Sequence, residues 1–447
     1  MRHVRCTVIA NMIRARWVAA TMVTVAACSE RSSRRNDVIS ERATATCYTA
    51  AEYPFPSVPL AGMVDFDDNA KALVFPGYIW DAGRFMPLEQ PPGSERLELA
   101  GLDNRGDVAG TAVYAGPLRR AFLWRNRIAH EIMTPVGSDA NAVALNEKGH
   151  VVGTWRIGTD PSHAYLFREG TLEDLGEGSA VALNASDHVL IVESIPVGEP
   201  RHPSRAWLWR DGTRTTIEIP PGRELAGFVG LNARDEVAGN TFSDPGDGTA
   251  VDYWPLYPFL WTGGVLHQLP TLGGPPLVHT CEWHAANHAY SINDRGDVVG
   301  SSSTKDGEHH AVLWREGTIH DLGFGGAWSS ASKINDRGQI LGSTWPTKEA
   351  ICAVIPIPVV WEDGIARALP TPPGFDSVWF DLNERGDVVE QVDAWDGHGG
   401  FRSRELIVWK AGQCVPDAGT DTGPSREDAE VPPPAEDEDE HENTRAR

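Results

Sequence analysis

The chain has 447 residues, of which 41% are hydrophobic, and its formal net charge is -23 at pH 7. This length allows two or three ordinary domains, or one closed repeat architecture. The negative charge argues against nucleic-acid binding, because phosphate recognition needs a basic face. Tryptophan is abundant, with 16 residues, and no long amphipathic helical pattern occurs in the body of the chain, so strands and hairpins are expected.

The N-terminal segment predicts export. Arginines precede a short apolar run, Trp17–Val25, which is too short to span a bilayer. The run ends in Val25-Ala26-Ala27-Cys28, which resembles the bacterial lipobox, in which the cysteine becomes the lipidated first residue of the mature protein. We expect a lipoprotein signal peptide over residues 1–27, lipidation of Cys28, and anchoring to the bacterial cell envelope. Ser29 follows the usual sorting pattern for an outer membrane or cell surface, whereas the alternative is an ordinary secretory signal with a chance cysteine.

Residues 28–55 are expected to form a polar tether. If Cys28 is lipidated, the cysteines left for disulfides in the mature protein are Cys47, Cys281, Cys352 and Cys414. An exported compartment permits disulfides, and four cysteines allow three pairings. A bridge between Cys47 and Cys414 would join the two ends of the repeat region, which a closed ring brings together.

Residues 56–417 consist of repeats with a period of roughly 45 residues, in the range of four-stranded propeller blades. Each copy has an apolar residue before Asn or Asp, and most copies have a glycine three residues further on. The clearer copies begin at Leu102-Asp103, Leu145-Asn146, Leu183-Asn184, Leu231-Asn232, Ile292-Asn293, Ile334-Asn335 and Leu382-Asn383, and a divergent one lies at Phe66-Asp67. A second hairpin in each copy is marked by Trp80, Trp124, Phe167, Trp209, Trp261, Trp314, Trp361 or Trp409.

The physics of one copy predicts two successive hairpins. Asn can bond its own backbone two residues on and open a turn, and the following glycine supplies positive φ. A four-stranded sheet cannot bury both faces alone, so neighbouring copies must stack on it. We therefore predict an all-β β-propeller of about seven or eight four-stranded blades, with a β-solenoid as the alternative. The recurrent tryptophans are expected to fill the core, in preference to stacking on sugars.

One copy carries a resemblance to a known family. Residues 292–300 read Ile-Asn-Asp-Arg-Gly-Asp-Val-Val-Gly, and His310-Ala311-Val312-Leu313-Trp314 follows shortly after. This is similar to the HAF repeat family of probable extracellular repeat proteins, in which His-Ala-Phe occupies the place of His310 to Val312. The resemblance covers about Val64 to Asp417. It implies an exported bacterial protein of β repeats, and it brings no established activity.

The best local candidate for a site lies in the longest unit, in the loop from Pro270 to Ala289. It contains Cys281 and Glu282 as well as His279, His284 and His288, residue types that suit zinc. The spacing matches no metal motif, and the sequence favours a loop with chance histidines, or a disulfide at Cys281, over a metal site. Calcium is a second possibility, at Asp244–Gly248 or at the repeated Asn-Asp-Arg-Gly-Asp turns, although turn chemistry accounts for the same residues. The sequence therefore predicts no resident cofactor, with zinc or calcium as the alternatives.

Residues 418–447 are rich in proline, aspartate and glutamate, and we expect an acidic disordered tail. No nucleophile elbow, phosphate loop, dinucleotide fingerprint or closely paired carboxylates are found. The sequence therefore favours a non-enzymatic, cell-surface lipoprotein whose propeller binds a protein or glycan partner. The alternative is a secreted hydrolase or lyase acting on polysaccharide or peptide, with its site at the channel mouth near Pro270 to Ala289.

Overall fold

The chain folds into strands and connecting turns in the computed structural model, and the described part of it contains no α-helix. No helix long and apolar enough to cross a membrane is found there either. The described residues are 46–54, 62–193, 205–243, 255–275, 277–279, 283–285, 287–345, 347, 356–372, 375–395 and 401–413.

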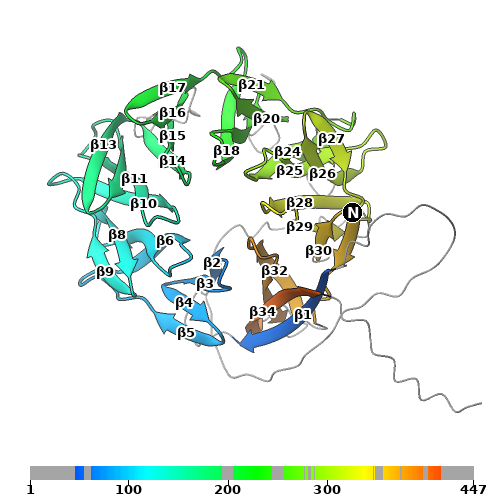
Figure 1. Cartoon of the computed structure of the whole chain (residues 1–447), viewed down its shortest axis with the longest axis horizontal. Coiled ribbons are helices and arrows are strands. Elements are labelled where there is room, and N and C mark those ends of the chain that lie inside the picture. Colours follow the sequence, from blue (N-terminus) through cyan, green and yellow to red (C-terminus); the bar gives the residue numbers. More distant parts are fainter. Residues whose placement is uncertain are drawn as a thin grey trace, which may run out of the picture.

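The strands form four-stranded antiparallel blades arranged in a ring, and each blade runs from an innermost to an outermost strand (Figure 1). Blades one and two are β2(Gly62–Phe66), β3(Ala72–Phe75), β4(Tyr78–Asp81), β5(Arg84–Pro87) and β6(Arg96–Leu102), β7(Val108–Val113), β8(Arg119–Arg125), β9(Ile128–Glu131). Blades three and four are β10(Asp139–Leu145), β11(Val151–Arg156), β12(His163–Arg168), β13(Thr171–Glu177) and β14(Ser179–Leu183), β15(Val189–Val192), β16(Ala206–Arg210), β17(Thr213–Ile217).

Blades five and six are β18(Glu224–Leu231), β19(Val237–Phe242), β20(Leu256–Thr262), β21(Val265–Gln268) and β24(His288–Ile292), β25(Val298–Ser303), β26(His309–Arg315), β27(Thr318–Asp321). Between them lies a short hairpin of β22(Leu277–His279) and β23(Trp283–Ala285). Blade seven is β28(Trp328–Ile334), β29(Ile340–Trp345), β30(Ile357–Glu362), β31(Ile365–Ala368), and blade eight is β32(Phe375–Leu382), β33(Val388–Trp395), β34(Phe401–Gln413), β1(Thr46–Pro54).

The ring has eight blades among the described residues. Six are separate four-stranded sheets, and blades six and seven join into one eight-stranded sheet through the single pair His309↔Trp328. The predicted propeller is confirmed, and of the seven or eight blades expected it has eight among the described residues. A β-solenoid, which stays open at both ends, is wrong.

Blade eight is built from both ends of the repeat region. β1 pairs antiparallel with β34 over nine residues, from Thr46↔Gln413 to Pro54↔Glu405, and so supplies the outermost strand. Residues 46–54 therefore belong to the propeller and not to the expected tether of residues 28–55. The repeat pattern does not predict this strand, because β1 is a single strand that follows a polar segment and has no neighbouring strand in the sequence to form a hairpin with.

The expected turn chemistry occurs at the end of each innermost strand. Gly296 has φ of 79°, a conformation that favours glycine, and Asp187 takes the equivalent place in blade four with φ of 68°. Further along, Gly300 lies so close to blade six's inner strand that an added Cβ would be 1.9 Å from the carbonyl oxygen of His288. Glycine is therefore favoured at these two positions of the repeat for different reasons: the first needs positive φ, and the second has no space for a side chain.

The hydrophobic core lies between neighbouring blades. Leu73 and Ile79 of blade one, for example, pack in one cluster with Val108 and Trp124 of blade two. The repeat tryptophans fill these layers as predicted, since Trp124, Trp314 and Trp409 are at most 1% exposed. Each blade thus buries both faces only because it has two neighbours.

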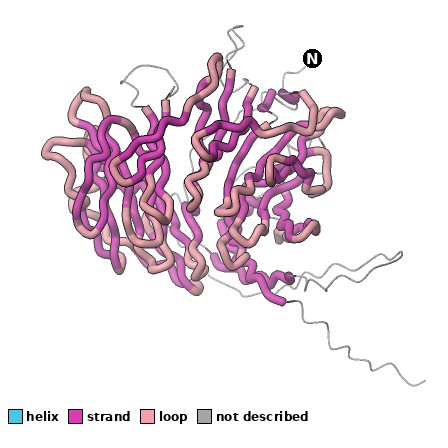
Figure 2. The backbone as a smooth tube through the Cα atoms, turned by 45° about the horizontal axis from the view of Figure 1, so that its top comes forward, coloured by secondary structure: helices cyan, strands magenta, loops and turns pink. Residues whose placement is uncertain are grey.

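The strands run between the two faces of the ring, and the turns and loops that connect them lie on these faces (Figure 2). One face carries the turn between the first and second strand of every blade, and the turns between third and fourth strands; we call it the turn face. The opposite face, the loop face, carries the connections between second and third strands and those between blades, including β22–β23. Trp409 of β34 pairs with Val388, which comes directly after the turn between the first and second strands of blade eight. Because β34 continues past Trp409 to Gln413, this strand ends on the turn face.

Candidate functional site

The turn that follows each innermost strand is held by one side chain. In blade six, the Asn293 Oδ1 atom accepts the backbone N–H groups of Arg295 and Asp297, both at 3.0 Å. Asn383 makes the same two bonds with Arg385 and Asp387, at 3.1 and 2.9 Å. This is the local role that the sequence predicted for the repeat asparagine.

The same asparagine also connects its blade to the next, which the sequence did not predict. The Asn293 Nδ2 atom donates to the backbone carbonyl oxygen of Asn335 in blade seven at 3.0 Å. Six of the eight blade junctions have this bond, at 2.9 to 3.0 Å: Asn146 to Asn184, Asn184 to Asn232, Asn232 to Asn293, Asn293 to Asn335, Asn335 to Asn383, and Asn383 to Asp67. We call this set the asparagine ring.

A second set of bonds runs parallel to it, one residue further along each turn. The backbone N–H of Asp294 donates to Asp336 Oδ1 of the next blade at 2.7 Å, and that of Asp336 donates to Glu384 Oε2 at 2.8 Å. The chain of bonds continues through Asp68 and Asn104 to Glu147. The side chains that accept these bonds are therefore held in fixed positions around the propeller axis on the turn face.

Five of these side chains are carboxylates, which we call the carboxylate ring: Asp68, Glu147, Asp294, Asp336 and Glu384. Partial burial, followed by repulsion from Asp336, Asp68 and Asp294, raises the pKa of Glu384 to about 7. Burial and neighbouring carboxylates also raise the pKa of Glu147 and of Asp336. The carboxylates of the ring therefore repel one another despite the backbone N–H groups that they accept.

A pair of opposite charges lies two residues before the turn, on adjacent inner strands. Lys333 Nζ of β28 is 2.6 Å from Asp381 Oδ1 of β32, and Asp65 of β2 is close enough to interact with both. Burial alone would lower the pKa of Lys333, but the two carboxylates raise it. Asp65 Oδ2 in turn accepts the backbone N–H of Leu102 in blade two at 2.8 Å. Lys333 thus neutralises negative charge that faces the axis beneath the carboxylate ring.

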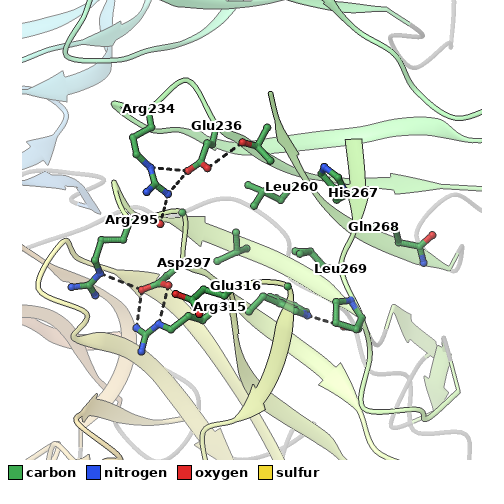
Figure 3. Close-up of a pocket in the computed structure, with 16 residues that line it drawn as sticks. Arg234, Glu236, Leu260, His267, Gln268, Leu269, Arg295, Asp297, Arg315 and Glu316 are labelled. Carbon is green, nitrogen blue, oxygen red and sulfur yellow. Dashed lines mark hydrogen bonds and ion pairs between the residues drawn. The ribbon is translucent and has the colours of Figure 1, made fainter. Parts of the chain in front are cut away.

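A cleft of about 670 Å³ opens between blades five and six (Figure 3). Its apolar floor includes Leu260, Leu269 and Trp314. Trp314 is buried and donates its indole Nε1–H to the carbonyl of Pro270 at 2.7 Å, so it shapes the floor without exposing its ring. Thr262 lies on the wall and donates to Glu236 Oε1 at 3.2 Å.

The charged groups of this cleft are paired. Arg234 Nη2 is 2.7 Å from Glu236, and Arg315 Nη2 is 2.7 Å from Asp297. Asp297 also pairs with Arg295, and although partial burial acts against ionisation, its two arginine partners hold its pKa below the usual value. With Glu316, the lining carries three arginines and three carboxylates, so its net charge is close to zero.

The cleft and the carboxylate ring are continuous. Arg234 donates to the backbone carbonyl of Arg295 across the blade junction, and the neighbouring Ala233 N–H donates to Asp294 of the ring at 2.7 Å. The turns that carry the ring therefore also form the inner end of the cleft. The turn face offers an acidic centre with one neutral, partly apolar groove leading away from it.

The histidine-rich loop is only partly described. His279 and His284 lie in the hairpin of β22 and β23, opposite Trp283 and Val278, and their side chains lie outside the described part, as does Cys281. His288 lies in β24, where its ring is 4.3 Å from that of Tyr290 and burial lowers its pKa to about 4. The described residues contain no group of three or more His, Cys, Asp or Glu side chains able to hold a metal. A zinc site in this loop stays a prediction.

The remaining predicted sites are mostly outside the described residues. Cys28, Cys352 and Cys414 lie there, together with Asp244–Gly248. Cys47 is placed in β1 opposite Gly412, and its side chain is not described. The disulfide between Cys47 and Cys414 therefore stays a prediction. At the repeated turns suggested for calcium, the side-chain oxygens of Asn293 and Asp294 already accept backbone N–H groups.

No protein-family model and no curated protein sequence matches the chain. Among solved structures, the chain is similar to the β-propeller domain of the Trilobed protease from Pyrococcus furiosus, with 12% identity and a TM-score of 0.40, covering 72% of this chain and 97% of that one. It is similar to the acylaminoacyl peptidase of Pyrococcus horikoshii, with 13% identity and a TM-score of 0.40, covering 71% of this chain and 53% of that one. TolB from Acinetobacter baumannii matches with 12% identity and a TM-score of 0.31, covering 67% and 78%. These likenesses concern the propeller fold alone.

Proposed function

We propose that this chain is an exported, non-catalytic binding protein whose turn face captures a positively charged segment of a protein partner. The observation that carries the proposal is the carboxylate ring. Its side chains are fixed by backbone hydrogen bonds from neighbouring blades, and partial burial together with their mutual repulsion raises the pKa of Glu384 to about 7. A bound lysine or arginine would relieve that repulsion without any rearrangement of the protein.

Charge elsewhere in the chain supports a cationic partner. The formal net charge is -23, and residues 418–447, with their run of aspartate and glutamate, follow the strand that leaves the propeller on the turn face. Fields of one sign speed the approach of an oppositely charged partner and select against like-charged ones. A neutral glycan would gain nothing from this field, and the buried Trp124, Trp314 and Trp409 offer it no aromatic surface.

The cleft between blades five and six fits the rest of such a segment. Its net charge is close to zero and its floor is apolar, with Leu260 and Leu269 as examples. An extended peptide could place a basic side chain at the carboxylate ring and lay its following residues into the cleft. Because the cleft begins at Ala233 and Asp294, both halves of the surface would be used by one continuous segment.

Binding of an oligolysine peptide, measured by calorimetry, tests the proposal. The double variant Asp336→Asn/Glu384→Gln should weaken binding at least about tenfold, and binding should fall steeply as salt is raised. Asp160→Asn, an exposed carboxylate in the connection between β11 and β12 on the loop face, serves as the matched control and should bind like the unmodified protein. Equal binding by all three proteins would refute the proposal, as would binding to a glycan panel with none to the peptide.

Export and anchoring complete the proposal. The lipobox-like Val25-Ala26-Ala27-Cys28 supports lipidation of Cys28 and attachment to the cell envelope, in keeping with the HAF-like repeats. Labelling with palmitate that is lost in Cys28→Ala, together with sensitivity of processing to globomycin, is the expected result. Unchanged labelling in Cys28→Ala would leave an ordinary secretory signal as the better explanation.

A hydrolase or lyase is the second candidate, and Glu384 is the observation in its favour. A carboxylic acid with a pKa of about 7 beside other carboxylates can donate a proton near neutral pH. If the chain is an enzyme acting on polysaccharide or peptide, product release should be lost in Glu384→Gln. Panels of polysaccharides and peptides that yield no product with the unmodified protein would remove this candidate.

A further inference from the structure

The asparagine ring has an exception at the junction between blades one and two. In the divergent first blade, Asp67 stands where most other blades have asparagine. Its Oδ1 atom accepts the backbone N–H groups of Asn69 and Lys71 at 2.9 and 2.7 Å, the same two bonds that each repeat asparagine makes. Its carbonyl also accepts the Asn383 side chain at 3.0 Å. The Asp67 carboxyl is therefore held in the conformation of an asparagine of the ring.

This conformation places an acceptor where a donor is needed. In the asparagine copies, Nδ2 donates to the carbonyl oxygen of the next blade, which in blade two is that of Asp103. In Asp67 the corresponding atom is Oδ2, which is buried and has no hydrogen-bond partner among the described residues, in a residue that is only 5% exposed. An ionised carboxylate facing a carbonyl oxygen would leave two acceptors together in a buried junction, at a considerable cost.

We infer that Asp67 is a proton-binding site, at which the neutral carboxyl donates its Oδ2–H to the Asp103 carbonyl oxygen and closes a seventh junction of the asparagine ring. The Asp103 carbonyl already accepts Gly106 N–H at 2.9 Å. The equivalent carbonyl of Asn184 accepts Asp187 N–H and Asn146 Nδ2 together, so there is room for a second donor. On ionisation the proton leaves to solvent and the junction loses its bond.

The charges around Asp67 act in both directions. Burial is the largest influence and raises its pKa, and Asp68 on the same turn adds to this, while Lys71 and the two backbone N–H groups oppose it. From blade two, Asp103 faces the junction with its partner Arg105; from blade three comes Glu147; and from blade eight comes Glu384. Three of these four groups are acidic, and the carboxyl of Glu147 is near enough for the charge of Asp67 to raise its pKa.

The next junction provides an internal contrast. Asp103 also replaces asparagine, but its Oδ2 accepts Arg105 Nε at 3.1 Å and Nη2 at 2.8 Å. Its Oδ2 atom thus has a cationic partner, which Asp67 Oδ2 does not have among the described residues. Asp67 and Asp103 are the same residue at the same place in the repeat, and they differ in whether a cation reaches Oδ2.

The predicted pH dependence has a definite sign. A carboxyl whose pKa is raised by folding stabilises the fold at low pH, and this contribution is lost as pH rises through the raised pKa. The decline should begin above the ordinary aspartate pKa of about 4. Asp67→Asn supplies a permanent donor, so it should remove the decline.

Thermal unfolding of the full chain from pH 4 to pH 8, without ligand, tests the inference. The Tm of Asp67→Asn should equal that of the unmodified protein at pH 4 and exceed it by about 2 °C or more at pH 8. Asp103→Asn, the matched control, should show no such growing advantage. Asn184→Asp should introduce a new decline of Tm with rising pH, because it places an ionisable carboxyl at a junction now closed by an amide, in a turn that has Ser186 where blade two has Arg105.

A second readout does not depend on the variants' stability. Infrared spectra of the unmodified protein should show the C=O stretch of a protonated carboxylic acid that disappears as pH rises, in step with the Tm decline, and is absent from Asp67→Asn. A constant Tm difference across the pH range, or an ionised Asp67 at pH 4 to 5, would overturn the inference. Since no ligand is involved, failure here would leave the proposed binding function untouched, and the reverse also holds.

Discussion

Asn383 donates its side-chain amide to the backbone carbonyl of Asp67 at 3.0 Å, across a separation of 316 residues in the chain. This bond joins the last blade to the first at the propeller axis. The pairing of β1 with β34 closes the same ring at its periphery. The ring is therefore closed twice, once by a ladder of backbone bonds and once by a side chain of the repeat motif itself.

Replacing Asn383 by alanine should destabilise the propeller by about 1–3 kcal/mol. The variant loses the bond to Asp67, and it also leaves the partly buried N–H of Arg385 and the buried N–H of Asp387 without their acceptor. Urea unfolding followed by tryptophan fluorescence measures the effect. Thr213→Ala, at the exposed start of β17, is the control and should change stability by less than about 0.5 kcal/mol. A cost as small as that of the control would mean that the bond does not contribute to closure.

The propeller was predictable because the repeat encodes it locally. A glycine that needs positive φ, such as Gly296, and a tryptophan buried between blades, such as Trp314, recur in most copies with recognisable spacing. The strand β1 was not predictable in this way. It is a single strand whose partner, β34, lies more than 350 residues away, and no short-range pattern records such a pairing.

The candidate site was missed because its signal lies between copies and not within one. Asp294, Asp336 and Glu384 look like ordinary turn residues when each copy is read alone. Only the ring geometry brings them into contact, since each accepts a backbone N–H from the preceding blade. The signal for the site in the sequence is the acidic residue that follows the repeat asparagine in several copies. The histidine-rich loop carries the more conspicuous pattern within a single copy, but its side chains are largely outside the described residues.

Two tryptophans at equivalent places make a matched pair of variants. Trp314 donates its Nε1–H to the Pro270 carbonyl at 2.7 Å, whereas Trp261 Nε1 is buried with no partner among the described residues. Phenylalanine at either place removes a similar volume, but only Trp314→Phe leaves a carbonyl without its donor. We expect Trp314→Phe to cost about 1 kcal/mol more than Trp261→Phe in urea unfolding. Equal costs would show that water satisfies Pro270 or that the indole bond contributes nothing.

The contribution of Lys333 to the stability of the propeller should increase as pH rises. In Lys333→Met the carboxylates of Asp381 and Asp65 lose the cation that lies near both, and their repulsion grows as they ionise. The Lys333 side chain is 42% exposed, so water screens the pair, and we expect a cost of about 1 kcal/mol at pH 7. The deficit should shrink toward pH 4, where carboxyls begin to protonate. Adding Asp381→Asn should restore most of the loss, and a double variant no better than Lys333→Met would contradict the charge-based explanation.

Glu384→Gln should stabilise the propeller at and above neutral pH. Folding raises the pKa of Glu384 to about 7, so the contribution of its neutral form is present below the ordinary glutamate pKa of about 4.3 and is lost as pH rises through 7. Glutamine cannot ionise, and its Oε1 can still accept the N–H of Asp336. The stability of Glu384→Gln relative to the unmodified protein should therefore grow between pH 4.5 and 7 and level off above it, as followed by Tm. Because the side chain is only partly buried, salt reaches it and should reduce the gain. Glu95→Gln controls for the change in net charge, and a pH-independent difference in Glu384→Gln would show that the ring does not hold its carboxylates in repulsion.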